Sequence, residues 1–577
     1  MSSKKKKYYL KKKTETSNDV AKHISKHSPG FSLSPLKFTF FVTLAFFLFA
    51  LIGLLNHELW RDEHQAWLVA RDAQSLSQLL DNMKYEGNPA LWHFFLFIIT
   101  RFSHDPVYMQ LFHLLVAVSF IFIFNRYAPL SNLHKILFSF GYFPLYEYGV
   151  ISRSYGLGVL LIFSICALYK HRISKYILIG FLLALLANVT IYALVIGAAI
   201  AGVLILDYFY YQQKNFKTTL QLGSGMVIFL AGLLFSLYQV WPEKDNSFPA
   251  PYATTPLEIS RWFQTSAKIF TTYFYIPQLN INFWNTTIFY KDPGLFGPNA
   301  FWPWIKEHPG YYLGLIIFPI VTFITGISLF IRKPLVLLLY LCSTLGLFAI
   351  YYYTALLHVR YSGYMFIALI ACYWISEYYP SKNYKAGWKD FLSLFGKKIY
   401  KPILTIMLVF SLIGSLAALS VDMTHKFSPS KDVADYIKIN KIDTLPIVGV
   451  TDFTISPLST FLDTSLYYPQ MDSTGSFTIW NSKRKNTMTF QEVVAQISKF
   501  MNQGHDRVLW VKDSAPQLTA DNGQKFDIEA AIIGENLQLD LLKKFDPGIV
   551  ADEKYYIYLV QKVDPSKVDA SKYIRIN

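Results

Sequence analysis

Long apolar segments recur along this chain, and they constrain its fold more than any other feature. They lie at about residues 38–55, 107–124, 133–147, 150–169, 176–191, 193–211, 220–240, 311–331, 335–353, 363–379 and 402–420. About 20 apolar residues cross a bilayer as a helix, and aromatic flanks extend the shorter segments. With 53% hydrophobic and only 16% charged residues, the chain is expected to be a polytopic α-helical membrane protein with about eleven transmembrane helices.

The first apolar segment, 38–55, is expected to be a retained helix and not a cleaved signal peptide. Its basic leader, residues 1–37, is too long, and no small-residue cleavage site precedes Trp60. Lysines crowd the leader, and other basic residues lie in short loops between apolar segments, which is the positive-inside pattern. We therefore expect the protein to lie in a cell membrane, the inner or plasma membrane, with its leader on the cytoplasmic side. The net charge of +16 is attributed to topology and membrane lipids, with no nucleic-acid partner.

The segment from Asn88 to Phe102 decides the orientation of every later loop. If it spans the membrane, the basic loops at 170–172 and 382–401 face outward. If it lies in the interface as an amphipathic helix, they face inward, as the positive-inside rule prefers. We expect the second arrangement, with the amino end inside and the carboxyl end outside. The outer segments are then the loops 56–106 and 241–310, the turn at 149–155 and the tail from 421.

The tail, residues 421–577, differs in character from the 38–420 membrane region. Short β-like runs occur at Pro446–Val450, Arg507–Val511 and Tyr555–Val560, and helical patterns at Ser430–Ile439 and Thr489–Met501. This alternation predicts a C-terminal extracytoplasmic α/β domain. No glycine-rich phosphate loop supports nucleotide binding there.

An acidic pair, Asp62 and Glu63, follows directly after the first apolar segment. Adjacent helix residues point about 100° apart, so the two carboxylates need not share one role. Partial desolvation at a membrane surface raises the proton affinity of a carboxylate, which suits it to act as a general base. The alternative is a solvated helix end with Arg61 as the salt-bridge partner.

Two further titratable groups, Glu86 and His93, flank a turn made by Gly87 and Pro89 on the same expected face. Together with Arg61 they are candidates for binding an acceptor or supporting the site. The alternative for His93 is an interfacial histidine with no ligand role.

Two cationic clusters are expected on the same face, one at Ser152–Tyr155 with Arg153, the other at His358–Tyr361 with Arg360. An arginine at a membrane helix end is costly unless it meets an anion, and its fork suits phosphate oxygens. For Arg153 the alternative is an ion pair with Asp62 or Glu63. For His358 and Arg360 it is snorkelling at the interface. An acid/base centre beside a phosphate-sized cation site fits transfer of a group from a lipid phosphate.

These motifs resemble those of GT-C-fold glycosyltransferases, in the group of protein O-mannosyltransferases and lipid A aminoarabinose transferases (family 39/83-like). The resemblance rests on the early Asp62-Glu63 pair, the Glu86-Gly87-Asn88-Pro89 turn, the run Ser152-Arg153-Ser154-Tyr155-Gly156-Leu157 and the later His358-Val359-Arg360-Tyr361. It covers roughly the first 210 residues well, the remaining spans by architecture and the tail loosely.

The resemblance implies an inverting glycosyltransferase with a polyprenyl-phosphate-linked sugar as donor and a lipid, glycan or protein hydroxyl as acceptor. It assigns Asp62 to the usual catalytic position with Glu63 as its neighbour. Arg153, His358 and Arg360 would contact the donor phosphate, and Tyr155 belongs to the same motif. Some relatives need a divalent metal, which Asp62, Glu86 and His93 have the chemistry to hold. We expect no metal and no other cofactor.

Two other function classes remain open from the sequence. A transporter or flippase of a lipid-linked glycan predicts functional ionisable residues inside the spans and inverted repeats. A non-catalytic scaffold would use the tail to hold a partner. The candidate residues instead gather on one expected face, which favours the transferase.

Overall fold

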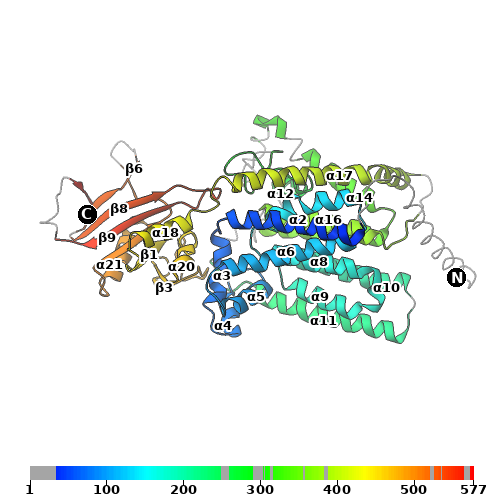
Figure 1. Cartoon of the computed structure of the whole chain (residues 1–577), viewed down its shortest axis with the longest axis horizontal. Coiled ribbons are helices and arrows are strands. Elements are labelled where there is room, and N and C mark those ends of the chain that lie inside the picture. The colour runs from blue at the N-terminus through cyan, green and yellow to red at the C-terminus, as the bar shows by residue number, and fades with distance from the viewer. Residues whose placement is uncertain are drawn as a thin grey trace, which may run out of the picture.

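The computed structural model describes residues 34–212, 214–247, 259–289, 303, 306–311, 316–354, 358–382, 387–519, 525–534, 536–564 and 572–576. The basic leader and much of the predicted 241–310 loop lie outside these residues. The described chain forms a helical bundle followed by a C-terminal domain built on a sheet, and Figure 1 shows the domain at one end of the bundle. We call that end of the bundle the domain-side end.

The bundle is built mainly from helices that run along one common direction (Figure 1). Its elements up to residue 240 are α2 (Pro35–Asn56), α3 (Arg61–Arg71), α4 (Leu76–Asn82), α5 (Leu91–Thr100), α6 (Val107–Tyr127), α7 (Asn132–Ser139), the π-helical turn η1 (Tyr142–Glu147), α8 (Tyr155–Leu168), η2 (Tyr169–Ser174), α9 (Tyr176–Ala187), α10 (Ile191–Tyr211) and α11 (Phe216–Val240). The later elements are α12 (Ile259–Thr271), η3 (Thr272–Phe274), η4 (Pro309–Tyr311), α14 (Phe318–Phe330), α15 (Pro334–Thr354), α16 (Val359–Ser376) and α17 (Trp388–Asp422).

The chain is an integral membrane protein. Seven helices of the described part are long and apolar enough to cross a bilayer: α2, α6, α8 with η2, α10, α11, α15 and α17. Large apolar side chains lie exposed on their outer faces, among them Phe40, Leu115, Val227 and Leu345. Such a surface is unfavourable in water and fits contact with lipid chains.

The predicted number of about eleven spans is not confirmed. The segment 133–147 is divided between α7, with 8 residues, and a π-helical turn of 6 residues, because Gly141 and Pro144 interrupt it. The described helices α9 and α14 have 12 and 13 residues. At 1.5 Å per residue such helices reach about 12–20 Å, short of the roughly 30 Å hydrocarbon core. The α5 helix, within the ambiguous 88–102 segment, has 10 residues and is also too short to span.

The C-terminal domain joins the bundle directly at the end of α17. Its helices are α18 (Ser430–Ile439), α19 (Asp452–Ile455), α20 (Pro457–Leu462) and α21 (Phe490–Met501). Its strands are β1 (Ile447–Val450), β2 (Leu466–Tyr468), β3 (Ser473–Gly475), β4 (Arg507–Lys512), β5 (Gln517–Thr519), β6 (Lys525–Asp527), β7 (Ala530–Ile533), β8 (Leu537–Phe545), β9 (Tyr555–Lys562) and β10 (Ile574–Ile576).

Eight of the described strands form one mixed sheet in the order β10-β7-β8-β9-β4-β1-β2-β3. The central strand β4 pairs in parallel with β1 and antiparallel with β9. Because side chains alternate between faces of a sheet, Val508, Trp510 and Tyr558 pack on the α21 side. Leu509, Val511 and Ile557 pack on the other side, with α18 and α20. The domain contacts α3 through α19 and α20, so the sheet is held against the domain-side end of the bundle.

Candidate active site

Three of the predicted site residues meet at the domain-side end of the bundle. Asp62 lies in the first turn of α3, Arg153 in the turn before α8, and Arg360 in the first turn of α16. The Asp62 Oδ2 atom is 3.1 Å from Nη2 of Arg360 and 3.8 Å from Nη1 of Arg153. Arg153 Nη1 also donates a hydrogen bond to the main-chain carbonyl of Asp62. Asp62 and Arg360 therefore meet although they are 298 positions apart in the sequence.

The start of α16 is held by side chains from other segments. The side chain of Asn285 accepts a hydrogen bond from the amide of Val359 at 3.1 Å. Asn285 itself has a positive backbone φ of 64°. The hydrogen bond satisfies one of the free amides that open a helix. The Tyr148 hydroxyl donates to the carbonyl of Arg360 at 2.8 Å. Both contacts fix the backbone from which the Arg360 side chain extends.

The Arg360 guanidinium lies among aromatic rings. Its Cζ atom is 4.9 Å from the ring centroid of Trp60, 5.3 Å from that of Trp284 and 4.9 Å from that of Tyr361. Cation–π contacts of this kind stabilise a desolvated charge. Arg360 is only 5% exposed, and among the described residues its Nε and Nη1 atoms have no hydrogen-bond partner. Buried donors are nearly always paired, so the Nε and Nη1 atoms of Arg360 are suited to donate hydrogen bonds to a bound anion.

Glu63, the neighbour of Asp62, is fully buried. One carboxylate oxygen accepts from the amide of Ser152 at 2.5 Å, and the other accepts from the amide of Trp60 at 3.2 Å. The second oxygen is also 3.2 Å from Nε2 of His57. Glu63 therefore ties the start of α3 to the end of α2 and to the turn that carries Arg153.

His57 extends this network to the last helix of the bundle. Its Nδ1 atom lies 3.0 Å from Oδ2 of Asp422, which also accepts from the Tyr146 hydroxyl at 3.1 Å. Burial acts to lower the pKa of His57, but the charges of Asp422 and Glu63 outweigh it and raise this pKa to about 10. The protonated His57 ring donates from both nitrogens and bridges the carboxylates of Glu63 and Asp422. These three residues form one buried ionic network next to Asp62.

The protonation of Asp62 differs from the expectation raised by its position at a membrane surface. Burial does act to raise the pKa of Asp62, but the positive charges of Arg360 and Arg153 outweigh it and hold this pKa below its usual value. Asp62 is therefore ionised at neutral pH, with its basicity reduced by its two partners.

The remaining predicted residues divide between the site and its surroundings. The Glu86 Oε1 atom accepts from the Gln65 amide at 2.6 Å, and Gln65 lies one helical turn after Asp62. Burial raises the pKa of Glu86 above its usual value, against the hydrogen bond from Gln65 and the charge of Arg153. His93 on α5 is 4% exposed, and both its ring nitrogens have no hydrogen-bond partner among the described residues.

Arg61 does not pair with its acidic neighbours as the alternative interpretation supposed. Its Nη2 atom is 2.7 Å from Asp552 Oδ2, and its amide donates to Glu553 Oε1 at 3.1 Å. It thus belongs to the junction with the C-terminal domain. The other alternative, an ion pair between Arg153 and Asp62, is present in the structure.

His358 and Tyr155 border the cationic pair without adding charge to it. His358 precedes α16, and its ring is 5.6 Å from that of Tyr361. Burial and the nearby charge of Arg360 lower the pKa of His358 to about 3, so it is neutral at physiological pH. Tyr155 opens α8, is 2% exposed and lies 5.8 Å from the Tyr361 ring.

Several residues of this region were not anticipated from the sequence. His57 and Asp422 lie just beyond the first and last apolar segments, and Glu147 is a charged residue inside one, which is a recognised sign of function or structure. Glu147 accepts hydrogen bonds from Tyr142 at 2.8 Å and from Trp284 at 3.2 Å. Trp284 comes from a loop with many aromatic residues, in which no single one stood out.

In the described ranges, no three His, Cys, Asp or Glu side chains are grouped so as to hold a metal ion. Asp62, Glu86 and His93 therefore do not form such a group.

Comparisons with known proteins give one structural likeness. No protein-family model matches this chain, and no curated protein matches it in sequence. Among solved structures, the chain is similar to the crystal structure of ArnT from Cupriavidus metallidurans bound to undecaprenyl phosphate. The two share 11% sequence identity with a TM-score of 0.44, over 82% of this chain and 92% of that chain.

Proposed function

We propose that this protein is an inverting glycosyltransferase of the GT-C type. It would move a sugar from a polyprenyl-phosphate donor to an acceptor hydroxyl at the extracytoplasmic face of the cell membrane. The observation that carries this proposal is the buried Arg360, which contacts the Asp62 carboxylate through Nη2, while its Nε and Nη1 atoms have no hydrogen-bond partner among the described residues. Arg153 contacts the same carboxylate. This is an anion site next to a base, at one end of a membrane-embedded bundle.

In the proposed reaction, the acceptor oxygen attacks the anomeric carbon of the donor sugar. The bond from that carbon to the phosphate oxygen breaks, and polyprenyl phosphate leaves with the bonding electrons. Asp62 takes the proton of the acceptor hydroxyl. Arg360 and Arg153 stabilise the charge that grows on the departing phosphate, which is the step where electrostatic stabilisation contributes most.

Donor binding would also activate the base. Asp62 now shares its negative charge with the two arginines, which lowers its pKa. A phosphate that takes hydrogen bonds from the same arginines brings a second negative charge close to Asp62. Like charges raise the proton affinity of a carboxylate. Asp62 would become an effective base only when the donor is in place, which limits the site to productive complexes.

The other residues receive supporting roles in this proposal. Glu63 has both carboxylate oxygens engaged with backbone amides and His57, so we assign it to positioning Asp62 and Arg153 and not to proton transfer. Glu86, with its raised pKa, lies on the acceptor side with Gln65. His358, neutral and next to Tyr361, is a hydrogen-bonding neighbour of the phosphate.

The deciding experiment incubates membranes containing the protein with a panel of labelled polyprenyl-phosphate sugars. We expect one label to move to an acceptor while free polyprenyl phosphate appears. Asp62→Asn should lower transfer at least about 100-fold, the usual scale for loss of a general base. Asp81→Asn, which alters an exposed carboxylate on the neighbouring α4, is the matched control.

Two outcomes contradict the proposal. Transfer at the wild-type rate in a correctly inserted Asp62→Asn protein would remove the base assignment. Movement of an intact labelled lipid across vesicles, with no release of polyprenyl phosphate, would identify a transporter instead.

A further inference from the structure

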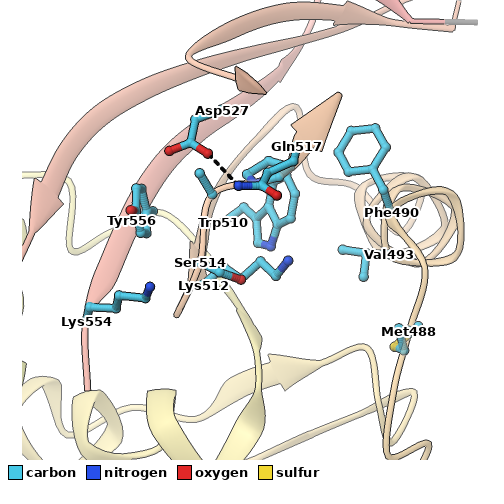
Figure 2. A pocket seen from close by; sticks show the side chains of 12 residues that line it. Met488, Phe490, Val493, Trp510, Lys512, Ser514, Gln517, Asp527, Lys554 and Tyr556 are labelled. Atoms are coloured by element: carbon cyan, nitrogen blue, oxygen red, sulfur yellow. Dashed lines mark hydrogen bonds between the residues drawn. The ribbon is translucent and has the colours of Figure 1, made fainter. Parts of the chain in front are cut away.

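The C-terminal domain contains a cavity whose lining includes none of the residues around Asp62. Its volume is about 440 Å³, and Figure 2 shows the side chains that line it. It lies at the amino end of α21, over the sheet face of β4 and β9. Figure 1 places α21 on the part of the domain that is away from the helical bundle.

The cavity exists because a helix covers only part of a sheet face. Val508, Trp510 and Lys512 alternate along β4, so all three point to the α21 side. Val508 and Trp510 belong to the apolar core beneath α21. The helix begins at Phe490, and Lys512 lies at the end of the strand, where it lines the cavity instead of a packed core. The neighbouring strand β9 brings Tyr556 opposite Lys512.

Among the described residues, one buried hydrogen-bond donor of this cavity lacks a partner, and two half-buried lysines also line the cavity. Trp510 is 1% exposed, and its indole Nε1 has no hydrogen-bond partner. Figure 2 shows the Trp510 ring next to Lys512 among the side chains that line the cavity. Within the described part of the chain, neither Lys512 nor Lys554 forms an ion pair with a carboxylate, whereas the nearby Asp527 accepts a hydrogen bond from the Gln517 amide at 2.9 Å. Burial lowers the pKa of Lys512, against the charge of Asp513, so this lysine is held in a partly desolvated position.

The rest of the lining is suited to a sugar ring. Phe490 and Tyr556 present aromatic surfaces on two sides of the cavity, and Gln517, Asp527 and Ser514 offer polar groups along its edge (Figure 2). Aromatic faces pack against the C–H groups of sugars, and a few placed polar groups fix orientation. Two lysines and an indole N–H add a demand for negative charge.

We propose that this cavity binds a sugar unit bearing an acidic substituent, a carboxylate or a phosphate, within a glycan chain. If the proposed transferase function holds, on which this second step rests, the glycan is the acceptor. A cavity distant from Asp62 would then hold one sugar unit of an extended acidic glycan while another unit reaches the active site. Such an arrangement selects polymeric acceptors over single sugars.

The test measures binding to the full-length protein in detergent micelles, without turnover. Saturation-transfer NMR and calorimetry would use glucose 6-phosphate and glucuronic acid, with glucose and inorganic phosphate as comparisons. We expect both acidic sugars to bind at least ten-fold more tightly than glucose or phosphate. A Lys512→Gln, Lys554→Gln double variant should lose at least ten-fold in affinity for both. The exposed Lys483→Gln, outside the cavity, should bind as the wild type does.

Several results would overturn the inference. These are equal binding by inorganic phosphate and glucose 6-phosphate, equal binding by glucose, or an unchanged affinity in the double variant. Trp510→Phe, which keeps an aromatic core residue and removes the N–H, provides an independent variant that should also weaken binding. The variants of this binding test change only side chains that line the cavity or the exposed Lys483, and none of them alters Asp62, Arg153 or Arg360. A failure of the transferase proposal thus leaves this binding result intact, and a failure of binding leaves the transfer assay intact.

Discussion

A single side chain, Arg360, has the most demanding environment at the domain-side end. One nitrogen of its planar fork contacts both Asp62 and the Tyr361 hydroxyl at 3.1 Å, while the other two have no hydrogen-bond partner in the described ranges. We expect Arg360→Lys to keep the charge and the ring contacts but lose the fork. Loss of a charged hydrogen bond costs about 1.5–3 kcal/mol, or roughly 10–100-fold in kcat/KM for the lipid-linked donor.

The matched control for this change is Arg332→Lys. Arg332 contacts Asp390, in the first turn of α17, at 3.5 Å. Figure 1 shows that α17 begins at the end of the bundle away from the C-terminal domain. Steady-state rates measured against donor concentration should be near wild type for this control. If Arg360→Lys also retains full kcat/KM, Arg360 binds no phosphate in the reaction.

At the residue scale, sequence reasoning reached the carboxylate and both arginines but not the network below them. Asp62, Arg153 and Arg360 each stand at the end of an apolar segment, so their shared membrane face follows from topology. The His57–Asp422 contact joins residues 365 positions apart. No local pattern shows which two loop residues will touch across a bundle. The lowered pKa of Asp62 also depends on that closure, since it comes from arginines on other segments.

Among the elements, α16 depends on a close approach that only glycine permits. A Cβ atom at Gly363 would collide with the Tyr148 hydroxyl and the Phe143 ring. The same Tyr148 hydroxyl holds the carbonyl of Arg360, one helical turn earlier. We expect Gly363→Ala to cost about 1–3 kcal/mol of stability through overpacking, despite the better helix propensity of alanine, and to lower turnover as Arg360 shifts.

Thermal unfolding in detergent and the transfer assay would measure these two effects. Gly202→Ala in α10 is the control, because a Cβ atom there meets no heavy atom within 4 Å. Its midpoint temperature should be unchanged or slightly higher. Equal behaviour of the two variants would show that α16 accommodates the added methyl group and does not depend on Gly363.

In the C-terminal domain, the observed bounds of the elements agree with those predicted from the sequence more closely than in the bundle. The helix predicted at Ser430–Ile439 has those bounds, and Thr489 caps α21 through its hydroxyl. Strand and helix periods differ enough to be told apart in a soluble domain. In the bundle, uniform apolarity hides where a helix stops. The 133–147 segment therefore read as a span although Gly141 and Pro144 divide it.

For the whole molecule, the decisive contact is the junction between the bundle and the C-terminal domain. Arg61 on α3 contacts Asp552 and Glu553 from the loop before β9, and it directly precedes Asp62 in the chain. Glu553 is fully buried, and one of its oxygens has no hydrogen-bond partner among the described residues. Asp552 has a side chain that is 64% exposed. The junction therefore contains one costly buried carboxyl and one solvated carboxylate around the same arginine.

This difference predicts how the stability of the molecule depends on pH. Burial raises the pKa of Glu553 to about 7, with the charge of Arg61 acting against it, while an unfolded glutamate titrates near pH 4.3. When the pKa of a group is higher in the folded state than in the unfolded state, protonation stabilises the folded state. This contribution is complete below the pKa of the unfolded state and is lost as pH rises to the pKa of the folded state. We expect the midpoint temperature to fall between about pH 4 and pH 7 for this reason.

Glu553→Gln should flatten that decline, because the amide keeps an oxygen for the Arg61 amide and carries no charge to desolvate. Asp552→Asn should leave the pH profile as in the wild type, since an exposed ion pair contributes little. Differential scanning measurements from pH 4.5 to pH 8 on all three proteins would decide the matter. A Glu553→Gln profile with the wild-type slope would place the pH dependence elsewhere.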